Sequence, residues 1–150
     1  MEFKPTYIIL HHSTTPVGTE FYTFEQVKQS HLNIGYDDVG YHKVIDDAGF
    51  VYDGRNESIM GAHCRHNGFN HKALGICLLG NFEINKPKAK QYVKAVIVVA
   101  DWCEKYNIPT KNILGHNETG ANTLCPGKYF DMDKFRQNVR YELENRNYNV

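Results

Sequence analysis

Hydrophobic and polar positions follow two different periods along this chain. Short apolar runs at residues 7–12 and 73–80 are bounded by turn-forming residues and are apolar on both faces, which predicts buried strands in the centre of a sheet. Residues 111–115 predict a further short strand. Residues 41–54 predict a hairpin that turns at residues 47–49.

The segments between these strands have a helical period. Thr23 and Gln26 have the spacing of a capping box, and Gly35 is suited to end the helix that they begin. The expected inner face of this helix consists of residues spaced three, four and three positions apart: Phe24, Val27, His31 and Ile34. Because His31 lies on an apolar face, we expect a core histidine with a hydrogen-bond partner.

Two further helices complete the pattern. The first can start with Pro87 and ends near Asn107. The second is capped by Asp131 and directs four residues to the core, Met132, Phe135, Val139 and Leu143. Strands that alternate with helices predict the α/β class, with a central mixed β-sheet flanked by helices on both sides. We expect residues 1–150 to form a single domain.

Composition narrows the class of protein. Hydrophobic residues make up 41% and charged residues 23% of the 150 residues, as in a globular domain. The formal net charge is zero, so charge does not indicate nucleic-acid binding. The apolar runs are too short for a signal peptide or a membrane span. We therefore expect a protein that is synthesised in the cytoplasm and does not insert into membranes. As a separate expectation, we predict a monomer.

The cysteines and histidines are the candidates for chemistry. None of the four cysteines has C-x-x-C spacing, which argues against a closed zinc knuckle, and the expected compartment argues against a disulfide framework. A catalytic zinc needs three protein ligands and an open position. One candidate set consists of one histidine of the pair His11 and His12, together with His116 and Cys125. Only one of His11 and His12 can easily serve a given metal, because adjacent strand residues point to opposite faces.

Other interpretations of these residues remain open. His116 and Cys125 are also consistent with a surface histidine and a half-buried thiol, or with a cysteine nucleophile and its base. A second candidate cluster contains His63, Cys64, His66 and His71, although a histidine-rich polar loop would look the same. The motifs H-E-x-x-H, G-x-S-x-G and the P-loop do not occur.

Four segments together resemble one family, the zinc-dependent N-acetylmuramoyl-L-alanine amidases. This family includes the small bacteriophage lysozyme-type amidases and the peptidoglycan recognition proteins. The similarity covers roughly residues 7–137. Each segment alone would be a weak signal, but their combination in this order is specific to the family. The segments are IILHHSTT, DVGYHKVIDDAGFVYDGR, GAHCRHNGFNHKALGICLLGNF and GHNETGANTLCPG. The resemblance implies the peptidoglycan recognition protein-like fold and one zinc ion, bound by His11, His116 and Cys125.

The resemblance also implies roles for other residues. Tyr41 falls on the tyrosine that helps to hold the attacking water and the transition state. Thr123 falls on a position that is lysine in the phage type and threonine in many recognition proteins, and a hydroxyl donates a weaker hydrogen bond than an ammonium. His63 and Asn70 fall on groove positions near the substrate.

The function implied is hydrolysis of the amide bond between N-acetylmuramic acid and L-alanine in peptidoglycan. The expected absence of a signal peptide favours a phage endolysin, which acts on the host cell wall after release from the cytoplasm. One alternative is a recognition protein that binds peptidoglycan without cutting it. Another is regulation through binding of the phage RNA polymerase, for which the sequence offers no support.

Overall fold

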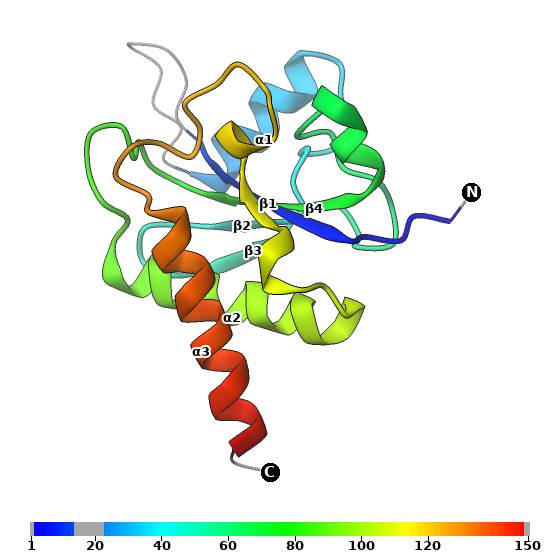
Figure 1. Ribbon diagram of the computed structural model, residues 1–150. Coiled ribbons are helices and arrows are strands. Elements are labelled where there is room, and N and C mark those ends of the chain that lie inside the picture. The colour runs from blue at the N-terminus through cyan, green and yellow to red at the C-terminus, as the bar shows by residue number, and fades with distance from the viewer. Residues whose placement is uncertain (1, 14–22, 149–150) are drawn as a thin grey trace.

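A five-stranded mixed sheet forms the centre of the molecule (Figure 1). The computed structural model describes residues 2–13 and 23–148. The strand order is β3-β2-β4-β1-β5, formed by β1 (Tyr7–His12), β2 (Lys43–Ile45), β3 (Val51–Asp53), β4 (Ala73–Leu78) and β5 (Ile113–Gly115). Strand β1 runs parallel to both of its neighbours, β4 and β5, and only the β2–β3 hairpin is antiparallel. The predicted mixed sheet and hairpin are confirmed.

Helices cover both faces of this sheet, as expected. The long helices α2 (Ala89–Tyr106) and α3 (Met132–Tyr148) pack on one face and on each other. Helix α1 (Phe24–Asn33) and the short 3-10 helix η1 (His66–His71) lie over the other face (Figure 1). The predicted α/β architecture, a central mixed sheet with helices on both faces, is therefore confirmed.

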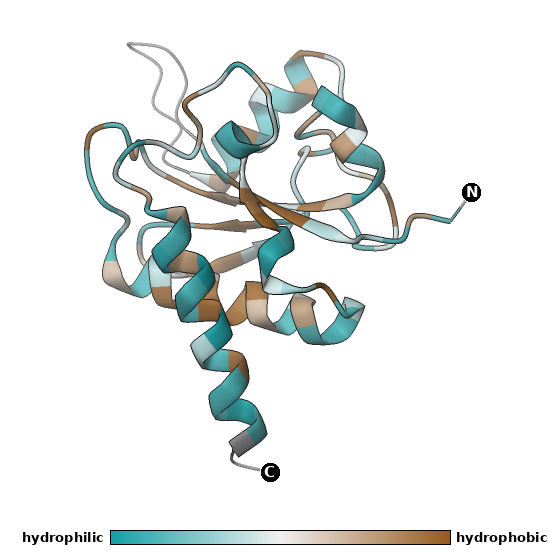
Figure 2. Cartoon of the chain, viewed as in Figure 1, coloured by the Kyte–Doolittle hydropathy of each residue, from teal (hydrophilic) through white to brown (hydrophobic). Residues whose placement is uncertain are grey.

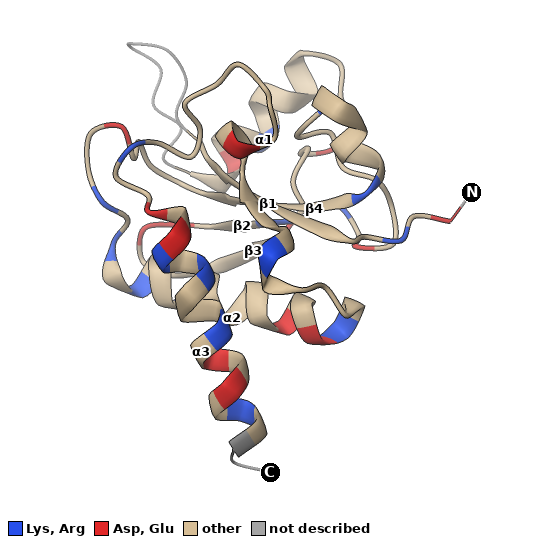
Figure 3. Ribbon diagram, in the orientation of Figure 1, with Lys and Arg blue, Asp and Glu red and all other residues tan. Residues whose placement is uncertain are grey.

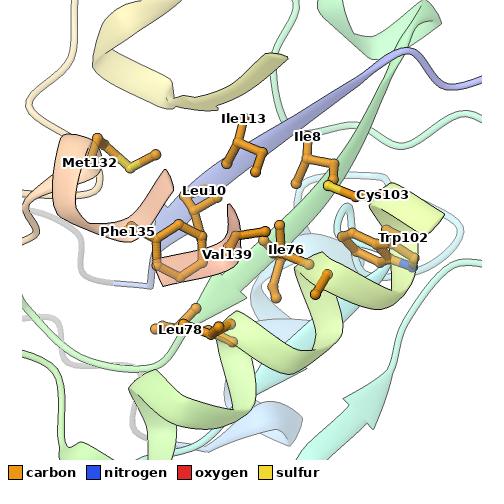
Figure 4. Close-up of a cluster of buried hydrophobic side chains, with 14 of the residues drawn as sticks. Ile8, Leu10, Ile76, Leu78, Trp102, Cys103, Ile113, Met132, Phe135 and Val139 are labelled. Carbon is orange, nitrogen blue, oxygen red and sulfur yellow. The ribbon is translucent and has the colours of Figure 1, made fainter. Parts of the chain in front are cut away.

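The main core lies between the sheet and the pair α2 and α3. Alternate residues of the central strands point into it, and in Figure 4 Leu10 and Ile76 face Phe135 and Val139 of α3. All four of these side chains are fully buried. The strands are accordingly the most continuously hydrophobic part of the chain (Figure 2). Ile9 and His11 point to the opposite face, so strand β1 contributes to both layers.

Helix α1 begins with the predicted capping box. The Gln26 amide donates to Thr23 Oγ1 over 3.1 Å, and the Thr23 amide donates to Gln26 Oε1 over 3.2 Å. Only part of its expected inner face is buried. Ile34 has the predicted spacing but is 67% exposed, because the helix ends at Asn33 and Ile34 is already the C-cap. His31 is partly buried and has a hydrogen-bond partner, the Gly40 amide.

The other two helices begin and end near the predicted residues. Helix α2 begins two residues after Pro87, and Asn107 ends it in the left-handed conformation, with φ of 55°. The Asp131 carboxylate accepts a hydrogen bond from the Lys134 amide over 3.0 Å and so caps α3. Of the four expected core residues of α3, Leu143 is only partly buried.

The outer surface is polar and of mixed charge. Lysine and arginine alternate with aspartate and glutamate along α3 (Figure 3). Arg146 of this helix pairs with Asp101 and Glu104 of α2 and with Glu142. In the part of the chain that the structure describes, no helix combines the length and apolarity that a bilayer span requires.

Replacement of Phe135 should show how much the fold depends on the contact between α3 and the sheet. Phe135→Ala should lower the free energy of unfolding by about 3–5 kcal/mol, because it removes a fully buried ring and leaves a cavity. Tyr141→Ala is the matched control, since Tyr141 lies on the same helix and is 66% exposed; it should change stability by less than about 0.5 kcal/mol. Urea denaturation measures both, and equal losses would contradict this packing.

Candidate functional site

Three potential metal ligands meet at one edge of the sheet. Leu10 of β1 pairs with Gly115 of β5, which places the following residues, His11 and His116, side by side. Their ring centroids are 4.6 Å apart, and His11 Nδ1 is 3.7 Å from Cys125 Sγ. The ligand atoms of these three residues all lie within 4.8 Å of one another. Among residues 2–13 and 23–148, no other group of three or more potential ligands is so arranged.

The geometry and chemistry of this cluster fit a zinc ion. Zn–N and Zn–S bonds of about 2.0–2.3 Å in a tetrahedron put the ligand atoms roughly 3.5 Å apart, close to the observed 3.7 Å between His11 Nδ1 and Cys125 Sγ. Two imidazoles and one thiol are ligand types that zinc prefers. His116 and Cys125 are partly exposed, so a fourth position can be reached from solvent. Three ligands with an accessible fourth position are typical of a catalytic site.

Burial makes all three groups neutral in the absence of a cation. It holds the pKa of His11 well below its ordinary value, and the neighbouring histidines lower it further. Burial also lowers the pKa of His116 and raises the pKa of the Cys125 thiol to about 12. A cysteine nucleophile works as the thiolate, which this environment disfavours. The alternative of a Cys125 nucleophile with His116 as its base is therefore not supported.

The loop that carries Cys125 is anchored on both sides. The His12 backbone amide donates to Cys125 Sγ over 3.4 Å, and the Asn117 amide donates to the Cys125 carbonyl over 2.7 Å. Gly127 has φ of +107°, and a Cβ at this position would lie 2.4 Å from the carbonyl carbon of Phe82. The sequence Cys-Pro-Gly thus ends in a residue without a side chain because the loop packs directly on the backbone at residue 82.

Helix α3 holds the turn that follows His116. Arg136 donates two hydrogen bonds to the Glu118 carboxylate, over 2.8 and 3.1 Å, and one to the Ile113 carbonyl over 2.8 Å. Glu118 in turn accepts from the Gly115 amide over 2.9 Å. Sequence reasoning missed both contacts of Glu118. The three-residue spacing of Gly115 and Glu118 is that of a capping interaction and could have indicated the hydrogen bond between them, but not the ion pair with Arg136.

A buried threonine fixes the same turn from the other side. The Thr119 hydroxyl donates to the His116 carbonyl over 2.7 Å, and the Asn67 side chain donates to the Thr119 carbonyl over 3.0 Å. Asn67 belongs to η1 and has a positive φ of 54°. No local pattern in the sequence indicates this contact, because it joins two loops that are far apart along the chain.

His12 is the histidine of the adjacent pair that does not join the metal candidates. Its Nδ1 accepts a hydrogen bond from the Phe82 amide over 3.1 Å. Burial lowers the pKa of His12 to about 4, so the ring is neutral. His12 therefore supports the loop at residue 82, and its backbone amide contacts Cys125.

The second candidate cluster is not assembled as a metal site. Cys64 is buried, and its thiol lies 3.6 Å from the Thr119 hydroxyl. His66 and His71 are exposed on η1. The histidine-rich polar loop was therefore the correct interpretation for this segment, and only His63 of this cluster reaches the metal candidates.

Tyr41 lies beside His11, one of the three candidate ligands. Its ring centroid is 5.0 Å from that of His11 and 5.4 Å from that of His31. Burial raises the pKa of the Tyr41 phenol well above its ordinary value, and the nearby Cys77 and Cys125 raise it further. The phenol therefore stays protonated and can act as a hydrogen-bond donor. Thr123 lies in the loop that carries Cys125, and its hydroxyl oxygen accepts from the Cys125 amide over 3.2 Å.

Of the two expected substrate-contacting residues, His63 contacts His11 directly and Asn70 contacts the backbone of His63. His63 Nδ1 is 2.9 Å from His11 Nε2, and His63 Nε2 donates to the Ala73 carbonyl over 3.1 Å. Burial lowers the pKa of His63 to about 3. Asn70 Oδ1 accepts from the backbone amides of His63 and Cys64, over 2.8 and 2.7 Å. Their contact with a substrate stays a prediction.

Comparison with known proteins assigns the chain to an amidase family. The chain belongs to the N-acetylmuramoyl-L-alanine amidase family, whose sequence profile matches residues 2–128. The resemblance inferred from the sequence motifs is thereby confirmed.

Individual relatives come from phages, animals and bacteria. The chain is 34% identical over 145 residues to an endolysin of Enterobacteria phage T3, covering 90% of each chain. It is 33% identical over 128 residues to peptidoglycan-recognition protein SC2 of Drosophila simulans, covering 81% of this chain and 68% of the relative. The solved structure of N-acetylmuramoyl-L-alanine amidase LysC from Clostridium intestinale superimposes with a TM-score of 0.82 at 28% identity, covering 92% and 87% of the two chains.

The protonation of Cys125 can be tested by alkylation of the metal-free protein. Because burial raises its pKa to about 12, the rate of modification by iodoacetamide should increase about tenfold per pH unit between pH 7 and 10, without a plateau. Mass spectrometry of the peptide that contains Cys125 measures this rate. The same peptide in denaturant is the control and should level off near an ordinary thiol pKa of about 8.5. A plateau below pH 8 in the folded protein would restore the nucleophile interpretation.

Proposed function

We propose that this chain hydrolyses the amide bond between N-acetylmuramic acid and L-alanine in peptidoglycan, with one zinc ion, and that residues 1–150 form one catalytic domain. The observation that supports this most directly is the convergence of His11, His116 and Cys125 beside Tyr41 in a member of the amidase family. The endolysin and amidase relatives support the same reaction.

The zinc ion would be held by His11 through Nδ1, by His116 and by Cys125 through Sγ. When bound, zinc supplies Lewis acidity, which acidifies a water molecule and polarises a carbonyl group. The neutral histidines present lone pairs without first losing a proton, whereas the Cys125 thiol must give up its proton to bind. The backbone amide of His12, which donates to Sγ, stabilises the thiolate that results.

Tyr41 and Thr123 would act on the substrate carbonyl. Tyr41 keeps its proton at neutral pH because of its raised pKa, so it can donate a hydrogen bond to the oxygen as negative charge develops there. Thr123 accepts from the Cys125 amide, which orients its hydroxyl within the ligand loop. As a neutral donor it would contribute less to charge stabilisation than a lysine at this position.

The substrate would lie across the edge of the sheet where these groups meet. His63 and Asn70 border this region, and the Asn70 amide group remains as a donor, because its oxygen is already used by two backbone amides. The groove would hold the glycan strand and the stem peptide of peptidoglycan. The formal net charge of zero gives no indication of nucleic-acid binding.

We further propose that the protein is an endolysin that acts as a monomer. The phage T3 relative, with 90% of both chains aligned, supports this assignment. Synthesis in the cytoplasm, followed by action on the bacterial cell wall after release, is part of this proposal.

A second candidate function is recognition of peptidoglycan without cleavage. It is favoured by the similarity to peptidoglycan-recognition protein SC2, at 33% identity. The two functions differ in one respect that can be measured, namely whether a bond is broken.

Digestion of purified peptidoglycan distinguishes the two functions. The native protein should release products with free L-alanine amino termini, and Cys125→Ser should release none, because a hydroxyl is a poor zinc ligand. Mass spectrometry identifies the products. Cys103→Ser is the matched control, since Cys103 is a buried thiol of the main core, outside the ligand cluster, and this variant should still cleave. Binding without cleavage by zinc-loaded native protein would favour the recognition function.

Tyr41→Phe tests the proposed role of the phenol. Loss of one hydrogen-bond donor to the developing charge should lower kcat by about 10²–10³-fold. The zinc content should stay at one ion per chain, since Tyr41 is not among the three ligands. Steady-state kinetics on a soluble muropeptide and zinc analysis of the same samples measure the two effects. An unchanged kcat would remove Tyr41 from the catalytic residues.

A further inference from the structure

We infer that His63 is a positioning residue for the metal centre, which sets the tautomer and orientation of His11. This inference rests on the proposed function, because it concerns how His11 is prepared to bind zinc. It assigns His63 a role toward the metal in place of the substrate contact that the sequence resemblance implied.

The first step concerns the far nitrogen of His63. Its Nε2 lies 3.1 Å from the carbonyl oxygen of Ala73 in β4. A carbonyl oxygen only accepts hydrogen bonds, so Nε2 must carry the proton. A neutral imidazole has a single ring proton, and the other nitrogen, Nδ1, is then an acceptor.

In the second step, the acceptor at His63 Nδ1 determines which nitrogen of His11 carries the proton. His11 Nε2 is 2.9 Å from His63 Nδ1 and has to be the donor of that hydrogen bond. The proton of the neutral His11 ring is therefore on Nε2, and the lone pair is on Nδ1. Nδ1 is the atom that lies 3.7 Å from Cys125 Sγ. His63 thus selects the only neutral tautomer of His11 that can bind a metal at this position.

The surroundings of His63 leave room for its ring and hold it in place. A Cβ on Gly75 would lie 2.6–2.8 Å from three ring atoms of His63, and a Cβ on Gly61 would lie 2.7 Å from His63 Cδ2. Two residues without side chains therefore form the space for the ring. Asn70 holds the His63 backbone, and His42 Nδ1 accepts from the Gly75 amide over 3.0 Å. The rings of His63 and His11 meet edge to face, with an interplanar angle of 88°.

A direct role of His63 toward the substrate would need a free ring nitrogen. Both nitrogens are occupied, one by His11 and the other by Ala73. The ring therefore offers neither a donor nor an acceptor to a substrate while this chain of hydrogen bonds is intact. Its connection to the reaction runs through His11.

The zinc affinity of His63 variants tests this inference. His63→Leu removes the acceptor and should weaken zinc binding by about 10–100-fold. His63→Asn retains an oxygen acceptor near the position of Nδ1 and should recover most of the affinity. His71→Ala is the control, because His71 is an exposed histidine of the neighbouring η1 and should bind zinc like the native protein. Competition with a chromophoric chelator gives the dissociation constants.

A readout without metal separates positioning from a general loss of structure. Long-range ¹H–¹⁵N NMR spectra distinguish the two tautomers of a neutral imidazole. In the metal-free native protein and in His63→Asn, His11 should be protonated at Nε2, whereas in His63→Leu both tautomers should be present. Thermal unfolding in the presence of a chelator identifies any variant that fails to fold.

The outcomes for the two proposals are distinct. Native-like zinc affinity and an unchanged His11 tautomer in a folded His63→Leu would overturn the role of His63, even if the native protein cleaves peptidoglycan. A native protein that binds zinc but cuts no peptidoglycan would overturn the proposed function alone. If the native protein bound no zinc, both proposals would fail.

Discussion

The parallel pairing of β1 with a strand on each side is the constraint on which the site depends. Strand β1 lies between β4 and β5, so its side chains must alternate between the two faces of the sheet. Leu10 then faces the main core, while His11 faces the candidate metal site. A shift of one residue would exchange His11 for His12 and would expose the apolar core residues. The energy of core packing therefore also fixes the position of the first ligand.

Burial then decides the chemical state of the ligands. The same loss of solvent lowers the pKa of His11 and raises that of Cys125, so both groups are neutral without a cation. A bound divalent ion would have the opposite effect on the Cys125 thiol: its positive charge would lower the pKa and favour the thiolate. Part of the binding free energy must therefore offset the ionisation of Cys125. The loop contacts from His12 and Asn117 limit the additional cost of ordering this ligand.

Local sequence patterns predicted those parts of the molecule that depend on nearby residues. The strands, the Thr23 capping box and the Asp131 cap all have short-range signatures, and the ligand set followed from residue types together with family motifs. Ile34 has the spacing of the apolar face of α1 but is exposed, because a periodic pattern does not show how far along a helix the core extends. Contacts such as Arg136–Glu118 and Asn67–Thr119 join separate elements and have no local signature.

The similarity to relatives alone does not separate cleavage from recognition. Identity is 34% to the phage endolysin and 33% to the peptidoglycan-recognition protein, and the fold is common to the family. The difference must therefore lie in the few groups that act on the bond. Cleavage requires a complete set of metal ligands, a position open to water and a protonated donor for the carbonyl oxygen. His11, His116 and Cys125 are the candidates for that set here, and the raised pKa of Tyr41 keeps its phenol protonated. Because a protein that only binds peptidoglycan has no need of these groups together, their coincidence favours an enzyme.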